Sequence, residues 1–119
     1  IWMGQISSVA KRVLERMDAF ISETDDAGRM PSYGKVAVAA IVGNEDGAHF
    51  SSAQLFQALN DVGFTIPAVA ACYWVGEAMG SIDFKDLAET PEKVAKTAKM
   101  VAGNAAHLAR LLADSPYPG

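Results

Sequence analysis

Two continuous apolar runs separated by a helical segment constrain the fold of this chain more than any other feature. The first run, residues 35–42 between two glycines, is apolar after its initial Lys35, and the second covers residues 68–75 after Pro67. Apolar runs of this length without alternation are typical of parallel strands that are buried on both faces. We therefore predict two parallel strands, each covered on both faces.

Helical segments precede, separate and follow these runs. The predicted helices cover residues 7–21, 51–63 and 90–113. Apolar residues recur at helical spacing in each segment, and hydroxyl side chains stand where N-caps are preferred. Ser51 or Ser52 is the predicted N-cap of the second helix, and Thr90 that of the third, with Pro91 in the first helical position. Helices that alternate with strands predict an α/β fold with a parallel sheet.

The chain begins with residues that are typical of the middle of a domain. Ile1 and Trp2 are an apolar pair, and the segment from Met3 to Ser8 reads as a loop that enters a helix. A sheet of two strands is marginal on its own. We therefore expect residues 1–119 to be the C-terminal part of a single domain whose N-terminal strands are absent.

Composition narrows the classes of function. The formal net charge is -4, which disfavours nucleic acid as a partner because phosphates attract clustered Lys and Arg. No apolar run approaches the roughly 20 residues of a membrane helix, and a single cysteine, Cys72, suits a reducing compartment. We expect a cytoplasmic protein with no membrane partner. Glu45, Asp46 and His49 are too few for a metal site with motif spacing, so we expect no metal.

Three loops are predicted to meet at the carboxyl edge of the sheet, where ligands bind in open parallel sheets. They cover residues 2–7, 43–50 and 76–89. The first two lead directly into helices, whose free N–H groups suit an electron-rich ligand. Trp2 and Met3 add a flat, polarisable surface. Tyr73, Trp74 and Met79 fit either a second pocket wall or a contact with a neighbouring subunit.

Two segments resemble a known family. The pattern Trp2-x-Gly4-x-x-Ser7-Ser8-x-x-Lys11-x-x-x-Glu15-Arg16 resembles the loop and helix after the third strand of flavodoxin-like NAD(P)H-dependent FMN reductases and quinone reductases. Gly34-Lys35 and Gly43-Asn44-Glu45-Asp46-Gly47 resemble the segments around the next strand. The resemblance implies a three-layer flavodoxin-like parallel sheet with FMN at its carboxyl edge, here without the N-terminal strands.

The resemblance also implies a set of cofactor-binding residues. They are Trp2, Met3, Gly4, Gln5 and Ile6 on one side of the flavin ring, Gly43, Asn44, Glu45, Asp46 and Gly47 on the other, and His49 near the ring or the nicotinamide. No side chain is implied as catalytic, because NAD(P)H would reduce the flavin and the flavin would reduce a quinone or similar small acceptor. The family's phosphate-binding loop has no counterpart here, so the isolated chain is expected to bind FMN poorly and to be inactive.

A second hypothesis needs no cofactor. A truncated α/β unit would serve as a non-enzymatic interaction module that completes its sheet with a partner chain. Open sheet edges and an aromatic last strand also lead us to expect a homo-oligomer. A phosphate-accepting receiver domain is disfavoured, because the predicted strands end in Val42-Gly43 and Val75-Gly76 rather than in aspartate.

Overall fold

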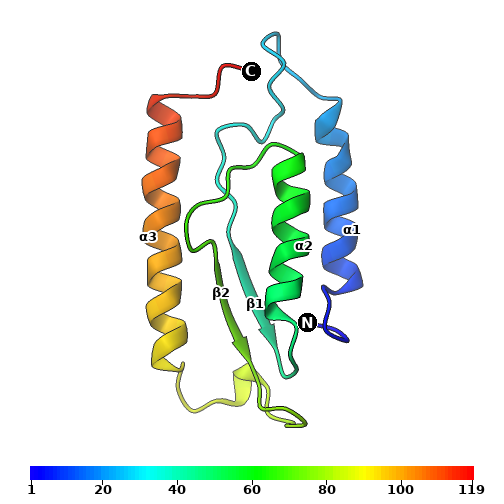
Figure 1. The fold of residues 1–119 in the computed structure, drawn as a ribbon, viewed down its shortest axis with the longest axis vertical. Coiled ribbons are helices and arrows are strands. Elements are labelled where there is room, and N and C mark those ends of the chain that lie inside the picture. Colours follow the sequence, from blue (N-terminus) through cyan, green and yellow to red (C-terminus); the bar gives the residue numbers. More distant parts are fainter.

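The computed structural model describes residues 1–119 as a two-stranded parallel sheet with three α-helices (Figure 1). In chain order the elements are α1 (Ser8–Arg16), the 3₁₀ helix η1 (Met17–Ile21), β1 (Ala39–Gly43), α2 (Ala48–Asp61), β2 (Ala71–Val75), the 3₁₀ turn η2 (Phe84–Asp86) and α3 (Glu92–Asp114). The predicted α/β class and the parallel sheet are confirmed. The flavodoxin-like three-layer arrangement, and the place of residues 1–119 within a larger domain, stay predictions.

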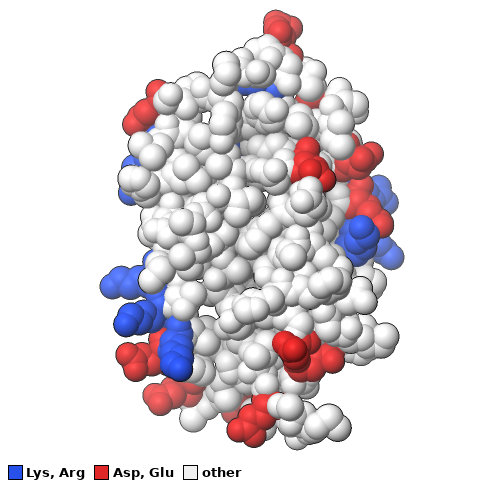
Figure 2. Space-filling model, viewed as in Figure 1, with Lys and Arg blue, Asp and Glu red and all other residues white.

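The helices cover the sheet unequally. Helix α2 packs on both strands, α3 packs on β2, and α1 lies beside α2. The N-terminus lies near the carboxyl end of β1, and the C-terminus lies at the opposite end of the molecule (Figure 1). On the face shown in Figure 2, Lys and Arg side chains gather over the lower half of α3, and the centre of this face is uncharged.

The core lies between α2 and one face of the sheet. Ala39 and Ile41 of β1 and Ala48 of α2 are buried, and apolar side chains of α2, β2 and Ile1 pack around them. Strand pairing runs from Ala39 opposite Ala71 to Gly43 opposite Val75, so the strands end at the same edge. This register places the loops that follow β1 and β2 next to each other.

Burial on both faces was a wrong prediction for β1. The strand alternates between buried and exposed residues, and Val42 is 48 % exposed. Only one face of β1 meets α2, so the alternate residues have no apolar layer over them. Both strands are also shorter than predicted. The segment before β1 makes only an isolated parallel bridge, between Val36 and Thr65, instead of a continuous ladder.

Two predicted helix starts are also wrong. Helix α2 begins at Ala48, with Gly47 as its N-cap, so Ser51 and Ser52 lie inside the helix and are buried. The Ser52 hydroxyl donates to the Ala48 carbonyl at 2.7 Å, which satisfies it without capping. Helix α3 begins at Glu92 with Pro91, not Thr90, in the N-cap position. No helix in residues 1–119 is long and apolar enough to cross a bilayer.

Candidate functional site

The N-terminal segment forms a tight turn at the carboxyl edge of the sheet. The Trp2 N–H donates to the Gln5 carbonyl at 2.8 Å, and the Gln5 N–H donates to the Trp2 carbonyl at 3.0 Å. Met3 and Gly4 have φ values of 50° and 74°, as both central residues of a type I′ turn do. Trp2 is 72 % exposed and Met3 is 77 % exposed. The turn therefore presents a large apolar surface to a ligand or to solvent.

This turn is held on the loop that follows β1. The Met3 N–H donates to Glu45 Oε1 at 2.8 Å, and the backbone nitrogen of Ile1 donates to the Val42 carbonyl at 3.1 Å. Gly47 lies so close to the turn that a Cβ at this position would be 2.7 Å from three backbone atoms of Gly4. The two loops singled out in the sequence are thus one connected surface.

A cavity of about 470 Å³ opens beside this surface. Its apolar wall includes Trp2, Val42, Trp74 and Phe84, and the rings of Trp74 and Phe84 are 5.6 Å apart with planes inclined by 55°. Aromatic rings in this arrangement give a planar ligand an apolar surface on which to stack. The cavity lies at the carboxyl ends of both strands, the usual ligand position in an open parallel sheet.

Polar groups stand at the rim of this cavity. The Asn44 side-chain amide donates to Asp83 Oδ1 at 3.2 Å, and Lys85 Nζ lies 3.8 Å from Asp83 Oδ2. Asp83, Phe84 and Lys85 were missed in the sequence, where residues 76–89 were recognised only as a loop. Their one signal was their position after the second strand, because an irregular loop has no periodicity that singles out a residue.

Several predicted site residues lie elsewhere. His49 is in the first turn of α2, and its ring meets Tyr73 edge-on at 5.2 Å instead of lining this cavity. Gln5 and Ile6 line a separate cavity of about 660 Å³ next to α1 and α2, which Trp2 and Met3 also border. The Asp46 carboxylate accepts the N–H of Gly47 at 2.7 Å and so shapes its own loop.

Two further observations bear on predicted ligands and partners. No group of three or more His, Cys, Asp or Glu side chains converges in residues 1–119. Met79 is fully exposed and lines none of the cavities described here, whereas Trp74 borders the cavity after β1 and β2. The sequence assigned Tyr73, Trp74 and Met79 either to a pocket wall or to a subunit contact. Of these three side chains, Trp74 is the one at the candidate site.

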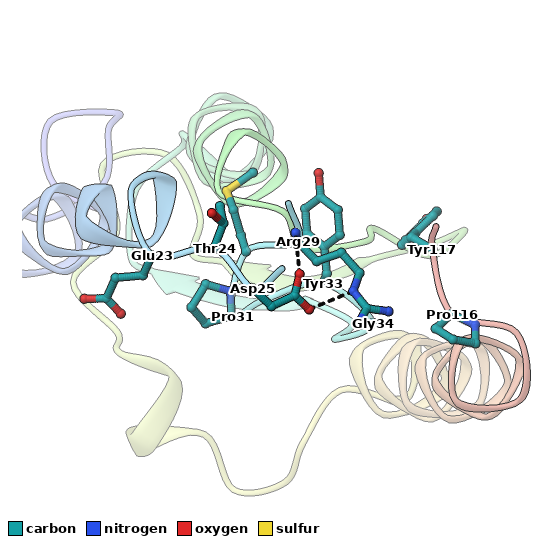
Figure 3. A pocket seen from close by; sticks show the side chains of 10 residues that line it. Glu23, Thr24, Asp25, Arg29, Pro31, Tyr33, Gly34, Pro116 and Tyr117 are labelled. Carbon is teal, nitrogen blue, oxygen red and sulfur yellow. Dashed lines mark hydrogen bonds and ion pairs between the residues drawn. The ribbon is translucent and has the colours of Figure 1, made fainter. Parts of the chain in front are cut away.

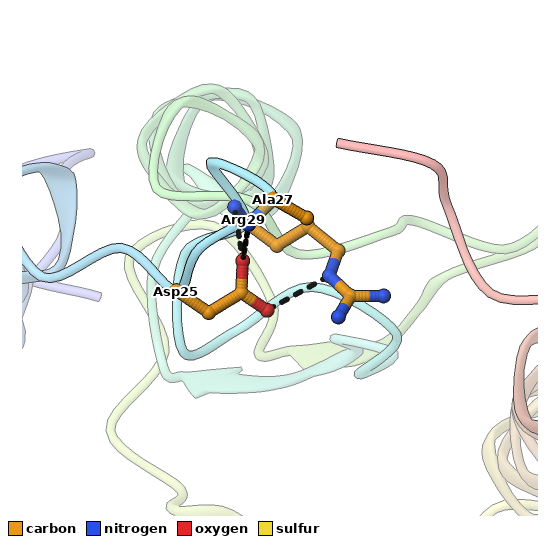
Figure 4. A network of polar contacts seen from close by, with 3 residues as sticks. All are labelled: Asp25, Ala27 and Arg29. Carbon is orange, nitrogen blue, oxygen red and sulfur yellow. Dashed lines mark hydrogen bonds and ion pairs between the residues drawn. The ribbon is translucent and has the colours of Figure 1, made fainter.

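The opposite end of the molecule has a cavity of its own, of about 550 Å³ (Figure 3). Residues of the loop after η1 and of the C-terminal tail line it, including Arg29, Tyr33 and Tyr117. The Arg29 guanidinium donates from Nε to Asp25 Oδ2 at 2.9 Å (Figure 4). The cation of this cavity is thus already paired with a carboxylate, and the cavity lies at the amino ends of the strands.

Asp25 also organises the backbone of this loop. Its Oδ1 accepts the N–H groups of Arg29 at 2.9 Å and Ala27 at 3.0 Å (Figure 4). The backbone hydrogen bond from Arg29 is the main cause that lowers the pKa of Asp25 below its ordinary value of 3.8. Hydrogen bonds to the ionised form favour that form.

Asp25 is therefore expected to add stability in a defined pH range. A carboxyl whose pKa is lower in the folded state stabilises the fold above pH 3.8, and this contribution is lost as the pH falls through the folded pKa. Asp25→Asn should remove that part of the pH dependence, whereas Asp26→Asn should leave it unchanged. Urea unfolding midpoints measured between about pH 2 and pH 6 test this. Equal pH profiles for wild type and Asp25→Asn would contradict it.

Comparison with known proteins adds information that the geometry lacks. No protein-family model matches the chain. It is 32 % identical over 120 residues to the 8-demethyl-8-aminoriboflavin-5'-phosphate synthase of Streptomyces davaonensis, a match that covers 98 % of this chain and 46 % of that enzyme. The crystal structure of RosB with the bound intermediate 8-demethyl-8-formylriboflavin-5'-phosphate aligns with all of this chain and 48 % of RosB, with a TM-score of 0.90 and 31 % identity. The chain spans about half the length of these relatives.

A shorter match involves a protein of another kind. Over 78 residues the chain is 41 % identical to the divalent metal cation transporter MntH of Mycobacterium bovis, covering 66 % of this chain and 11 % of the transporter. Nearly all of the transporter lies outside this match. The likeness therefore carries no argument about transport.

These findings correct the family and the activity expected from the sequence. The relatives are enzymes of flavin phosphates, so membership in the NAD(P)H-dependent FMN reductases and quinone reductases was a wrong prediction. The predicted electron transfer from NAD(P)H through FMN to a quinone is wrong for the same reason, and the non-enzymatic alternative gains no support. The residues behind the resemblance build a turn at Trp2–Gln5 and a helix N-cap at Ser7, whose side chain accepts the Ala10 N–H at 3.2 Å. Such residues determine local shape and leave the chemistry open.

Proposed function

We propose that this protein binds a riboflavin 5'-phosphate with the flavin ring in the cavity at the carboxyl edge of the sheet, and that it is part of an enzyme that acts on this flavin. The observation that carries the proposal is the likeness to RosB, which extends over all of this chain and whose crystal structure contains a flavin phosphate. The flavin would be the molecule acted on, because the Streptomyces davaonensis relative is named as the synthase of a modified riboflavin 5'-phosphate.

The residues present suit the ring part of such a ligand. Trp2, Trp74 and Phe84 give it apolar surfaces, and Asn44, Glu45 and Lys85 place polar groups at the rim. The flavin ring is planar, with an apolar body and polar edges, so its apolar and polar parts match those of the cavity. The chain has no Ser/Thr/Gly-rich turn of the kind that cradles a phosphate. Our proposal therefore concerns the ring, and we assign no residue of this chain to the phosphate.

Riboflavin 5'-phosphate is expected to quench the tryptophan emission of the protein saturably, when the protein is produced at the full length that its gene encodes. Trp2→Ala should weaken binding roughly three- to ten-fold, since an aromatic stacking pair contributes about 0.5–1.5 kcal/mol beyond its buried area. Trp2→Phe is the matched control and should retain most of the affinity. Binding would be followed by the change in the visible absorption of the flavin, so that loss of Trp2 does not remove the signal.

Two results would contradict the proposal in different ways. If the visible spectrum of the flavin does not change at protein concentrations up to about 1 mM, the protein does not bind flavin with useful affinity. If the flavin binds equally well to wild type and to Trp2→Ala, its ring lies away from the turn. In the second case the cavity would have to be reassigned.

A further inference from the structure

The contact between Asn44 and Asp83 joins two loops at the candidate site. Asn44 follows the last residue of β1, and Asp83 stands directly before η2, 39 residues further along the chain. Both residues line the cavity after the strands, and the Asn44 side-chain nitrogen lies 3.2 Å from Asp83 Oδ1. Lys85 Nζ lies 3.8 Å from the other carboxylate oxygen, Asp83 Oδ2. Asp83 Oδ1 is therefore the oxygen that faces Asn44.

This contact determines which end of the Asn44 amide is available. An ionised carboxylate only accepts hydrogen bonds, so the amide must turn its NH₂ group toward Asp83. Rotation of the amide would place its oxygen against the carboxylate, where two acceptors repel each other. The carbonyl oxygen of Asn44 then receives no hydrogen bond from any protein group and is free for a ligand. The carboxylate also polarises the amide, which strengthens its oxygen as an acceptor.

The flavin ring has one group that matches such an acceptor. In its oxidised form the ring carries a single N–H, at N3, between two carbonyl groups. We propose that Asn44 Oδ1 accepts this N3–H and that Asp83 is a positioning residue that keeps the amide in the required orientation. The inference rests on the proposed function, because it names the part of the flavin that this cavity recognises.

The proposal predicts a specific sensitivity to methylation at N3. The protein would be titrated with riboflavin 5'-phosphate and with its N3-methyl derivative, and the ratio of the two dissociation constants would be compared between variants. In the wild type the N3-methyl derivative should bind about ten-fold more weakly, since it lacks the donor and leaves the Asn44 oxygen unpaired. In Asn44→Ala the ratio should fall to about one to two.

Two further variants separate orientation from general structure. Asp83→Asn replaces a pure acceptor by an amide with both donor and acceptor, so the Asn44 amide is no longer fixed and the ratio should lie between those of wild type and Asn44→Ala. Asn60→Ala is the matched control. Asn60 is also an exposed asparagine whose side-chain nitrogen donates at 3.2 Å, to the Phe64 carbonyl, but it lies outside this cavity. Its ratio should equal that of the wild type.

The outcomes distinguish the role of Asn44, the role of Asp83 and the proposed function. A ratio in Asn44→Ala that equals the wild-type ratio overturns the role of Asn44 and leaves the proposed function standing. An Asp83→Asn variant with the wild-type ratio overturns the positioning role of Asp83. A wild-type protein that binds neither flavin overturns both this inference and the proposed function. Because the ratio compares two ligands on one folded variant, a loss of stability alone does not change it.

Discussion

Gly47→Ala is expected to lower the free energy of unfolding by about 2–5 kcal/mol and to weaken flavin binding in the protein that still folds. Gly47 has a φ of 138°, in a region that residues with a Cβ rarely adopt, and a Cβ there would lie 2.7 Å from backbone atoms of Gly4. The obstacle is backbone, which cannot rotate away as a side chain can. The turn at Trp2–Gln5 would have to move off the loop after β1, and Trp2 would leave the cavity.

Gly28→Ala separates the two causes of this loss. Gly28 also has a positive φ, of 78°, but a Cβ at this position would meet nothing within 4 Å. It should show the conformational cost alone, about 1–2 kcal/mol. Chemical denaturation of both variants, followed by flavin titration of each, would test this. A Gly47→Ala variant that loses no more stability than Gly28→Ala would show that the two loops separate without cost.

Ile41→Ala should cost about 2–5 kcal/mol of stability, the largest effect expected for a side chain of the sheet. Ile41 is 7 % exposed and lies in the core cluster with Ala39 and Ala48. Its buried neighbours Ala39 and Ala48 are too small to fill the space that the truncation leaves, and the larger side chains packed against the cluster, Leu55, Phe56 and Val75, are held in regular elements. Removal of three carbon atoms at this position therefore leaves a cavity as well as a loss of buried apolar surface.

The next residue of the same strand is the matched control. Val42 points to the other face of β1 and is 48 % exposed, so Val42→Ala should cost under about 1 kcal/mol. Both variants would be compared by urea denaturation, with equal slopes as a check that the unfolded states are alike. Equal losses for the two variants would contradict burial on one face of β1.

Elements of the fold were predictable where the sequence pattern and the local physics agree. The order of helices and strands followed from apolar runs and helical spacing, because these patterns record which side chains meet a core. The start of α2 did not, because its N-cap is Gly47, which leaves no side-chain signature, whereas Ser51 and Ser52 imitate one. Exposure of one face of β1 was not predictable either, because an apolar run records what a strand is able to bury and not what covers it.

The candidate site was predictable in its position and less so in its members. Parallel strands bring their following loops together, which is why loops at residues 2–7 and 43–50 were predicted at this edge, and the two loops do meet in the structure. His49 was assigned to the ligand by the family resemblance, but it lies in the first turn of α2, where its ring meets Tyr73. Asp83 and Phe84 come from an irregular segment, and only the three-dimensional structure reveals which residues of such a segment reach the cavity.

The contact between Gly4 and Gly47 determines which residues at the candidate site can be varied without loss of its shape. Because the backbone of Gly4 lies where a Cβ on Gly47 would stand, the alignment of the loops depends on the absence of a side chain at Gly47, whereas the exposed side chain of Met3 takes no part in this contact. Met3 is therefore a suitable position for a combinatorial library aimed at ligand preference, limited to residues that tolerate its φ of 50°, with Asp46 and both glycines kept invariant. Diversity introduced there would change the chemistry of the surface while its shape is maintained by the main chain.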